Sequence, residues 1–195
     1  QLAENTLESL SARELAKQCG YIPQKSGITI DLTVLDVVLM GYHPDLSLLQ
    51  PPTAQMKEHA KATLTMVGLP DREQKNYNQL SEGQKQLCIL ARTFVGTRKL
   101  LLLDEHTAAL DPKTAAKVLE ITEMIVNRDH LTTMMITHNM QDAITHGNRL
   151  IMMMEGKIIL DIQGEEKKKL TVKNLLDQFE KASGEEFSND SALLG

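Results

Sequence analysis

The stretch from Leu80 to Pro112 reads LSEGQKQLCILARTFVGTRKLLLLDEHTAALDP and contains three features in a fixed order. A Ser-Glu-Gly-Gln turn, Ser81 to Gln84, precedes apolar residues at helical spacing. The wholly apolar run 100–103 then stops at two carboxylates, and a second acidic turn follows at Asp111. This order predicts a helix, a buried strand and a second helix, with polar groups at each junction.

The turn at Ser81 has the pattern of a helix start. Serine is a favoured N-cap, and Gln84 three residues later completes a capping box. A helix N-terminus presents unpaired N–H groups and partial positive charge, which suits a phosphate group. The alternative is an ordinary capped helix, and for this pattern alone that is the commoner interpretation.

The run 100–103 is apolar on both faces, as expected of a strand inside a covered parallel sheet. The adjacent carboxylates of Asp104 and Glu105 cannot both face a dry core without partners. They belong at the carboxyl end of the strand, where open α/β sheets bind ligands. There an aspartate is a natural Mg²⁺ ligand, and the next residue can position or deprotonate a water. A lone Asp-Glu pair without this context indicates only a solvated turn.

Two further polar residues follow predicted strands. Gln24 comes after a short strand at 19–23, and His138 comes after a strand at 131–136. Because the carboxyl ends of parallel strands meet at one edge, we expect both side chains and the acidic pair along a single rim of one sheet. Taken singly, Gln24 indicates a structural loop residue and His138 a structural histidine.

Length and charge narrow the class of protein. A chain of 195 residues is long enough for one domain with a substantial core, and its net charge of −5 argues against a nucleic-acid surface. Cys19 and Cys88 lie in apolar segments without metal-ligand spacing, which indicates reduced, buried thiols and a cytoplasmic location. No apolar run approaches the roughly 18 residues of a membrane span, so a role at a membrane would require a partner.

The hydrophobic periodicity predicts an α/β fold in one domain, 1–195. We expect an α-helical subdomain at 33–97, with Thr33 as an N-cap and a helix from Thr53 to Gly68. The core sheet is expected from 19–24 and 98–162. The Met-rich run 149–154 is expected to be a buried strand that turns into a hairpin partner at 157–162. The remainder, 163–195, is expected to hold a solvated charge run at 164–169, a final amphipathic helix and a polar, poorly ordered tail.

The motif order resembles that of the ATP-binding subunits of ABC transporters. The resemblance extends from Ser11 to about Ser188. The resembling pieces are the signature at 81–84, the Walker B strand ending in Asp104 and Glu105, the D-loop at 109–112, the Q-loop in YIPQ (21–24) and the H-loop at His138. The sequence departs from that pattern at Glu82, where glycine is usual, and at His106, where proline is usual. The resemblance implies a P-loop NTPase-like core sheet with an inserted α-helical subdomain.

The resemblance also implies cofactors and roles. ATP would be bound with Mg²⁺, and the Mg²⁺ would be held by Asp104 and Gln24. Glu105 and His138 would be catalytic. The residues that would contact nucleotide are Gln24, Ser81, Gly83, Gln84 and Asp111, with the signature reaching the γ-phosphate held by a second ATPase subunit in a head-to-tail dimer.

The partners implied by the resemblance place the protein at a membrane. They are transmembrane permease subunits and, indirectly, a periplasmic or extracellular binding protein, with the ATPase peripheral at the cytoplasmic face of the cell membrane. The segment TVLDVVLMGY (33–42) is similar to importers of iron chelates, haem and cobalamin. The segment DEHTAALDPKTAAKVLE (104–120) is similar to ATPases of aromatic amino-acid importers. We favour metallo-chelate import slightly over amino-acid import, because partner choice should follow the helical subdomain.

The phosphate-cradling motif G-x-x-x-x-G-K-[ST] does not occur in the sequence; the Gly156-Lys157 pair is followed by isoleucine in the predicted hairpin. Members of the resembled family carry this motif ahead of the Q-loop, so we expect an N-terminally truncated chain. Such a chain should bind ATP weakly or not at all, be inactive alone and expose core surface. The alternatives are a non-catalytic regulatory or binding module, and a soluble ABC-type ATPase of translation or DNA repair.

Overall fold

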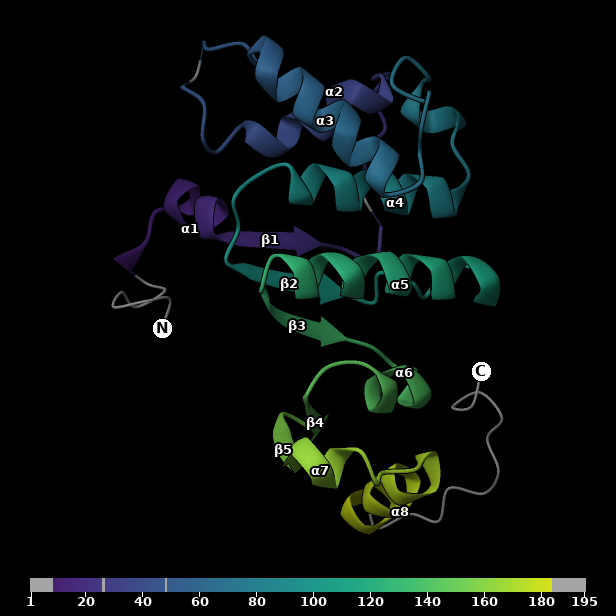
Figure 1. The fold of residues 1–195 in the computed structure, drawn as a ribbon. Helices are drawn as coiled ribbons and strands as arrows, with labels where there is room; N and C mark the ends of the chain where they lie inside the picture. Colours follow the sequence, from purple (N-terminus) through teal and green to yellow (C-terminus); the bar gives the residue numbers. More distant parts are fainter. Residues whose placement is uncertain (1–8, 26, 48, 184–195) are drawn as a thin grey trace. The chain divides into compact units, whose positions relative to one another are not determined.

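The computed structural model describes residues 9–25, 27–47 and 49–183, so the polar tail expected from 184 onward lies outside the described residues. The contacts divide the chain into two units, one ending at Ile136 and one beginning at Thr137. The single-domain division expected from the sequence stays a prediction. The helices and strands are α1 (Ala12–Gln18), β1 (Cys19–Ile22), α2 (Val34–Leu39), η2 (Met40–Tyr42), α3 (Ala54–Met66), η3 (Tyr77–Gln79), α4 (Glu82–Phe94), β2 (Leu100–Asp104), α5 (Pro112–Arg128), β3 (Thr132–Ile136), α6 (Met140–Thr145), β4 (Arg149–Met154), β5 (Lys157–Gln163), α7 (Gly164–Lys167) and α8 (Val172–Ser183) (Figure 1).

The first unit is built on a parallel sheet of three strands in the order β1-β2-β3. One face of this sheet is buried: Ile22, Leu101 and Leu103 are each at most 2% exposed. The other face is half open, with Tyr21 51%, Met134 54% and Ile136 48% exposed. The expectation that 100–103 is buried on both faces is therefore wrong for the described residues, because Leu100 and Leu102 lie on the open face and are only partly buried.

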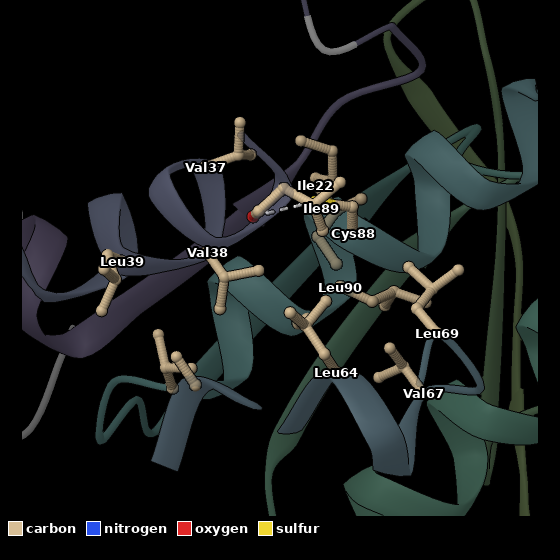
Figure 2. Close-up of a cluster of buried hydrophobic side chains, with 14 of the residues drawn as sticks. Ile22, Val37, Val38, Leu39, Leu64, Val67, Leu69, Cys88, Ile89 and Leu90 are labelled. Carbon is tan, nitrogen blue, oxygen red and sulfur yellow. Dashed lines mark hydrogen bonds between the residues drawn. The ribbon is translucent and has the colours of Figure 1, made fainter. Parts of the chain in front are cut away.

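The helices α2, α3 and α4 pack together, with α4 against β1, and supply a large part of the core (Figure 1). Figure 2 shows Val38 and Leu39 of α2, Leu64 of α3 and Leu90 of α4 gathered in one apolar cluster. These helices start where the sequence predicts, because each N-cap side chain accepts a bond from the third backbone N–H of its helix. The N-caps are Thr33, Thr53 and Ser81. Gly68, with φ of +84°, takes the left-handed conformation just beyond α3.

The second unit holds an antiparallel hairpin, β4 and β5, and the helices α6, α7 and α8. The expectation of a buried 149–154 strand is wrong: Leu150 is buried, whereas Ile151 and Met153 are 44% and 58% exposed. The expectation that the charge run at 164–169 is solvated is also wrong in part, because its first four residues form α7 and Lys167 is buried. The ammonium of Lys167 donates to the carbonyl oxygens of Ile144 and His146, at the C-terminal end of α6.

Candidate nucleotide and metal site

The acidic pair stands where β2 ends and the chain turns. Asp104 is the last residue of β2, and the backbone N–H of Glu105 still donates to the Ile136 carbonyl at 3.0 Å. Glu105 has φ of +45°, a backbone conformation that is uncommon for a residue with a side chain and is often found at functional sites. Because of this turn, two consecutive carboxylates follow the strand, each half-buried at the carboxyl end of the sheet.

Each carboxylate is held by a side chain from β1 or the loop after it. The amide Nε2 of Gln24 donates to a carboxylate oxygen of Glu105 at 3.1 Å. The hydroxyl of Tyr21 donates to a carboxylate oxygen of Asp104 at 2.9 Å, and this bond raises the pKa of Tyr21 above its usual value. The structure therefore brings Gln24, Asp104 and Glu105 together on one rim of the parallel sheet, where ligands bind in such folds.

Sequence reasoning did not find Tyr21. Its contact depends on which residues of β1 and β2 lie opposite each other, and in the sheet Tyr21 faces Leu102. Side chains two residues apart on a strand point to the same face, so Asp104 is the diagonal neighbour of Tyr21 on that face. Strand alternation could have placed Tyr21 and Gln24 at the same end of β1, but only the register between strands identifies the partner.

The donor set suits a hard cation. Within the described residues, no group of three or more His, Cys, Asp and Glu side chains is arranged to hold a metal. Asp104 and Glu105 nevertheless offer carboxylate oxygens, and Gln24 retains an amide oxygen besides the Nε2 that binds Glu105. Mg²⁺ takes oxygen ligands and is commonly bound by one or two carboxylates together with substrate phosphates, so these residues fit Mg²⁺ with a nucleotide.

The signature turn forms a second group with the acidic turn before α5. Ser81 and Gln84 make the predicted capping box, in which Ser81 Oγ accepts from the Gln84 N–H and Gln84 Oε1 accepts from the Ser81 N–H, both at 3.3 Å. Asp111 caps α5 by accepting from the Thr114 N–H at 3.1 Å. Hydrogen bonds from the Thr114 side chain and backbone lower the pKa of Asp111, so it is ionised at neutral pH.

Gly83 is the point where these two helix starts meet. A Cβ atom at Gly83 would lie 2.2 Å from Cγ2 of Thr114, so only glycine fits between α4 and α5 here. Gly83 itself is buried, whereas Ser81 and Asp111 are exposed. The geometry leaves the N-termini of α4 and α5 side by side, each with partial positive charge and N–H groups that can face an anion.

His138 belongs to the second unit, two residues beyond the end of β3, and its side chain is exposed. It is followed by Asn139, which caps α6 by accepting from the Asp142 N–H at 3.0 Å. Its participation in a site with Glu105 stays a prediction. His106 is 3% exposed, which fits a residue of the turn rather than a ligand-binding position.

A separate hollow of about 380 Å³ lies in the first unit and includes none of the predicted site residues. Thr93, Arg98 and Arg128 are among its lining residues, together with Leu131, which precedes β3. It is therefore at the amino ends of the parallel strands, whereas ligands of open α/β sheets bind at the carboxyl ends. We assign the candidate site to the acidic rim for this reason.

The α/β fold, with Gln24, Asp104 and Glu105 at the carboxyl end of its parallel sheet, is that of a nucleotide-binding domain of the P-loop NTPase class. The profile of the ABC transporter family matches residues 1–108, which is more than half of the chain. The chain belongs to this family, as an ATP-binding domain. Among the helices within the described residues, none combines the length and apolar character that crossing a membrane requires.

Individual relatives agree with this assignment. The chain is 48% identical over 103 residues to the tyrosine transport ATP-binding protein of Clostridioides difficile, a match covering 53% of this chain and 41% of that protein. It is 31% identical over 193 residues to the phosphonates import ATP-binding protein PhnC 2 of Cupriavidus metallidurans, covering 97% of this chain and 69% of that protein. A solved ABC transporter assigned to the metal-chelate type, in an inward-facing conformation, superimposes with a TM-score of 0.74 at 28% identity over 83% of this chain and 63% of that one.

Proposed function

We propose that this chain contributes the residues for ATP hydrolysis to an ATP-binding site. Hydrolysis at this site would drive import through a membrane permease. The observation that carries the proposal is the hydrogen bond between Gln24 and Glu105, because it joins a candidate sensor loop to a candidate catalytic carboxylate on the ligand-binding rim. The whole protein's activity is a proposal since the chain spans only 41% and 69% of the two curated relatives described above.

In this proposal the two carboxylates have different tasks. Asp104 would hold Mg²⁺ directly or through water, with the amide oxygen of Gln24 as a second ligand. When bound, Mg²⁺ would neutralise charge on the β- and γ-phosphates of ATP. Glu105 would accept a hydrogen bond from the attacking water and so polarise it, while Gln24 keeps the Glu105 carboxylate in place.

The remaining residues would act on charge that develops at the γ-phosphate. His138 would donate a hydrogen bond to that phosphate, which is the electrostatic stabilisation expected of such a group. Ser81, Gly83, Gln84 and Asp111 would face the nucleotide of a second ATPase subunit in a head-to-tail dimer. The exposed pair of helix N-termini in the described residues supports an anion at this position.

The relatives support the proposed partners and the proposed class of substrate. Two curated relatives are named for the transport of tyrosine and the import of phosphonates, and the solved one for metal chelates. We propose that the chain works peripherally at the cytoplasmic face of the membrane with a permease, and indirectly with a binding protein. The transported solute would be a metallo-chelate or an amino acid, with metallo-chelates slightly favoured.

The test is Glu105→Gln in a protein that joins this chain to the P-loop segment of the Clostridioides difficile relative. ATP turnover should fall by about 10²-fold or more, because the carboxylate that activates the water is lost. Glu120→Gln, which removes an exposed carboxylate paired with Lys117, should leave turnover unchanged. Equal turnover in wild type and Glu105→Gln would reject the mechanism.

The second candidate is a regulatory or binding module that uses no hydrolysis. The 195 residues contain no G-x-x-x-x-G-K-[ST], the motif whose lysine and backbone N–H groups would bind the phosphates of ATP. A titration of the unmodified chain with a fluorescent ATP analogue separates the two functions. Weak or undetectable binding that becomes tight after the P-loop segment is joined favours the ATPase, whereas a joined protein that binds ATP without hydrolysing it favours the module.

A further inference from the structure

Tyr21 is a large side chain whose polar end makes a defined contact while its ring is half open. The residue is 51% exposed, so packing alone gives little reason for an aromatic side chain at this place. Its hydroxyl donates to one carboxylate oxygen of Asp104 at 2.9 Å. The hydroxyl, rather than the ring, is therefore the part of Tyr21 that the candidate site uses.

The contact is built into the sheet. Tyr21 lies opposite Leu102 in the parallel register of β1 and β2, and Asp104 follows on the same face. Rotation of the aspartate about its side-chain bonds would turn its oxygens away from the rim, and a donor on the neighbouring strand restricts that rotation. The hydrogen bond from Tyr21 holds one carboxylate oxygen of Asp104, and because the carboxylate is planar this bond also limits where the other oxygen can lie.

We propose that Tyr21 is a positioning residue that orients the Asp104 carboxylate for a divalent cation. The inference rests on the proposed function, in which Asp104 holds Mg²⁺. A phenol donates one hydrogen bond without bringing a charge, so it fixes the aspartate and leaves its negative charge available to the cation. Gln24 does the same for Glu105 at 3.1 Å, which gives each carboxylate of the pair its own neutral donor from the β1 side.

The experiment measures Mn²⁺ binding to the full 195-residue chain by the loss of the free-ion electron paramagnetic resonance signal. Tyr21→Phe removes only the hydroxyl and should weaken Mn²⁺ binding by about tenfold, the lower end of what loss of such an outer partner costs. Tyr42→Phe is the matched control, because it removes a hydroxyl that is bonded to His59 Nδ1 at 2.7 Å and lies elsewhere in the same unit. Its Mn²⁺ affinity should equal that of wild type.

Asp104→Asn separates the two levels of the argument. If Asp104→Asn abolishes Mn²⁺ binding and Tyr21→Phe binds as wild type does, the positioning role is wrong and the metal site stands. If wild type binds no Mn²⁺, or Asp104→Asn binds it unchanged, the metal assignment falls and the positioning role falls with it. Tyr21→Phe should add nothing to Asp104→Asn in the double variant, and an additional loss there would contradict action through Asp104. Thermal unfolding of each variant excludes a general loss of structure.

Discussion

At the scale of single residues, Gly83 offers the clearest test of packing. Alanine normally stabilises a helix relative to glycine by about 1 kcal/mol, but here its Cβ would lie 2.2 Å from Cγ2 of Thr114. Thr114 is β-branched and cannot easily rotate away. We expect Gly83→Ala to lower the free energy of unfolding by about 1–3 kcal/mol, the usual cost of overpacking, as measured by denaturant titration.

A second substitution checks that the clash is the cause. Thr114→Ser keeps the hydroxyl and removes Cγ2, so Gly83→Ala should cost less in the Thr114→Ser background than in wild type. Equal costs in both backgrounds would show that Thr114 does not make the position specific for glycine.

The two cysteines should react at different rates. Burial raises the pKa of Cys88 to about 12, and it also raises the pKa of Cys19, which is only half-buried. At pH 8 the Cys88 thiol is therefore protonated, whereas the thiolate is the reactive form. We expect iodoacetamide to label Cys19 in the native protein and Cys88 only in denaturant, as read by mass spectrometry of peptides. Equal native labelling would contradict the buried position of Cys88.

At the scale of elements, Lys167 connects α7 to the end of α6. A helix leaves its last carbonyl groups without partners inside the helix, and the Lys167 ammonium satisfies the carbonyls of Ile144 and His146. Lys167→Met should lower the free energy of unfolding by about 1–2 kcal/mol, because these acceptors lose their donor. Amide hydrogen exchange should speed up across 140–146.

The neighbouring lysine is the control for this prediction. Lys168 forms an exposed ion pair with Glu165, and such pairs contribute little. Lys168→Met should change stability by less than about 0.5 kcal/mol and leave exchange at 140–146 as in wild type. Similar effects of both substitutions would mean that charge, and not the contact with α6, explains the result.

At the scale of the whole molecule, the open face of the parallel sheet should govern self-association. Tyr21, Met134 and Ile136 are each about half exposed on this face, whereas parallel sheets are usually covered on both faces. Met134→Lys puts a charge on β3 and should slow aggregation, because charges on exposed strands hinder edge and face pairing. Light scattering during incubation at raised concentration measures the effect.

Met124 on α5 provides the comparison, since it is 48% exposed and lies outside the sheet. Met124→Lys adds the same charge and should slow aggregation much less than Met134→Lys. If both variants aggregate at the same reduced rate, net charge rather than the sheet face controls the association.

The sequence predicts the local structure well where the signal is local. The capping box at Ser81 and the N-cap at Thr33 are present as expected, because an N-cap bonds to residues three positions away. The parallel strands expected at 100–103 and 131–136 are also present, as β2 and β3. Their expected burial is wrong, because β2 is buried on one face only and no residue of β3 is fully buried. The family follows from motif order, and the comparison with known families confirms it.

The sequence fails where exposure depends on distant segments. The strand 149–154 looks buried by composition, yet Met153 is exposed because only one face of the hairpin is covered in the second unit. Lys167 looks solvated within a charged run, yet it is 3% exposed because the C-terminal carbonyls of α6 receive its ammonium. Hydrophobicity patterns report an average preference and carry no information about which partner is present.

The sequence by itself determined the helix starts, the strand runs and the acidic pair at the end of β2, because these depend on periodicity and on contacts within a few residues. Only the tertiary structure decided that Tyr21 holds Asp104, that Gln24 holds Glu105 and that Gly83 must clear Thr114. Those contacts join residues 31 to 83 positions apart in the chain, and they exist only once strand register and helix packing have been set by burial of the shared core.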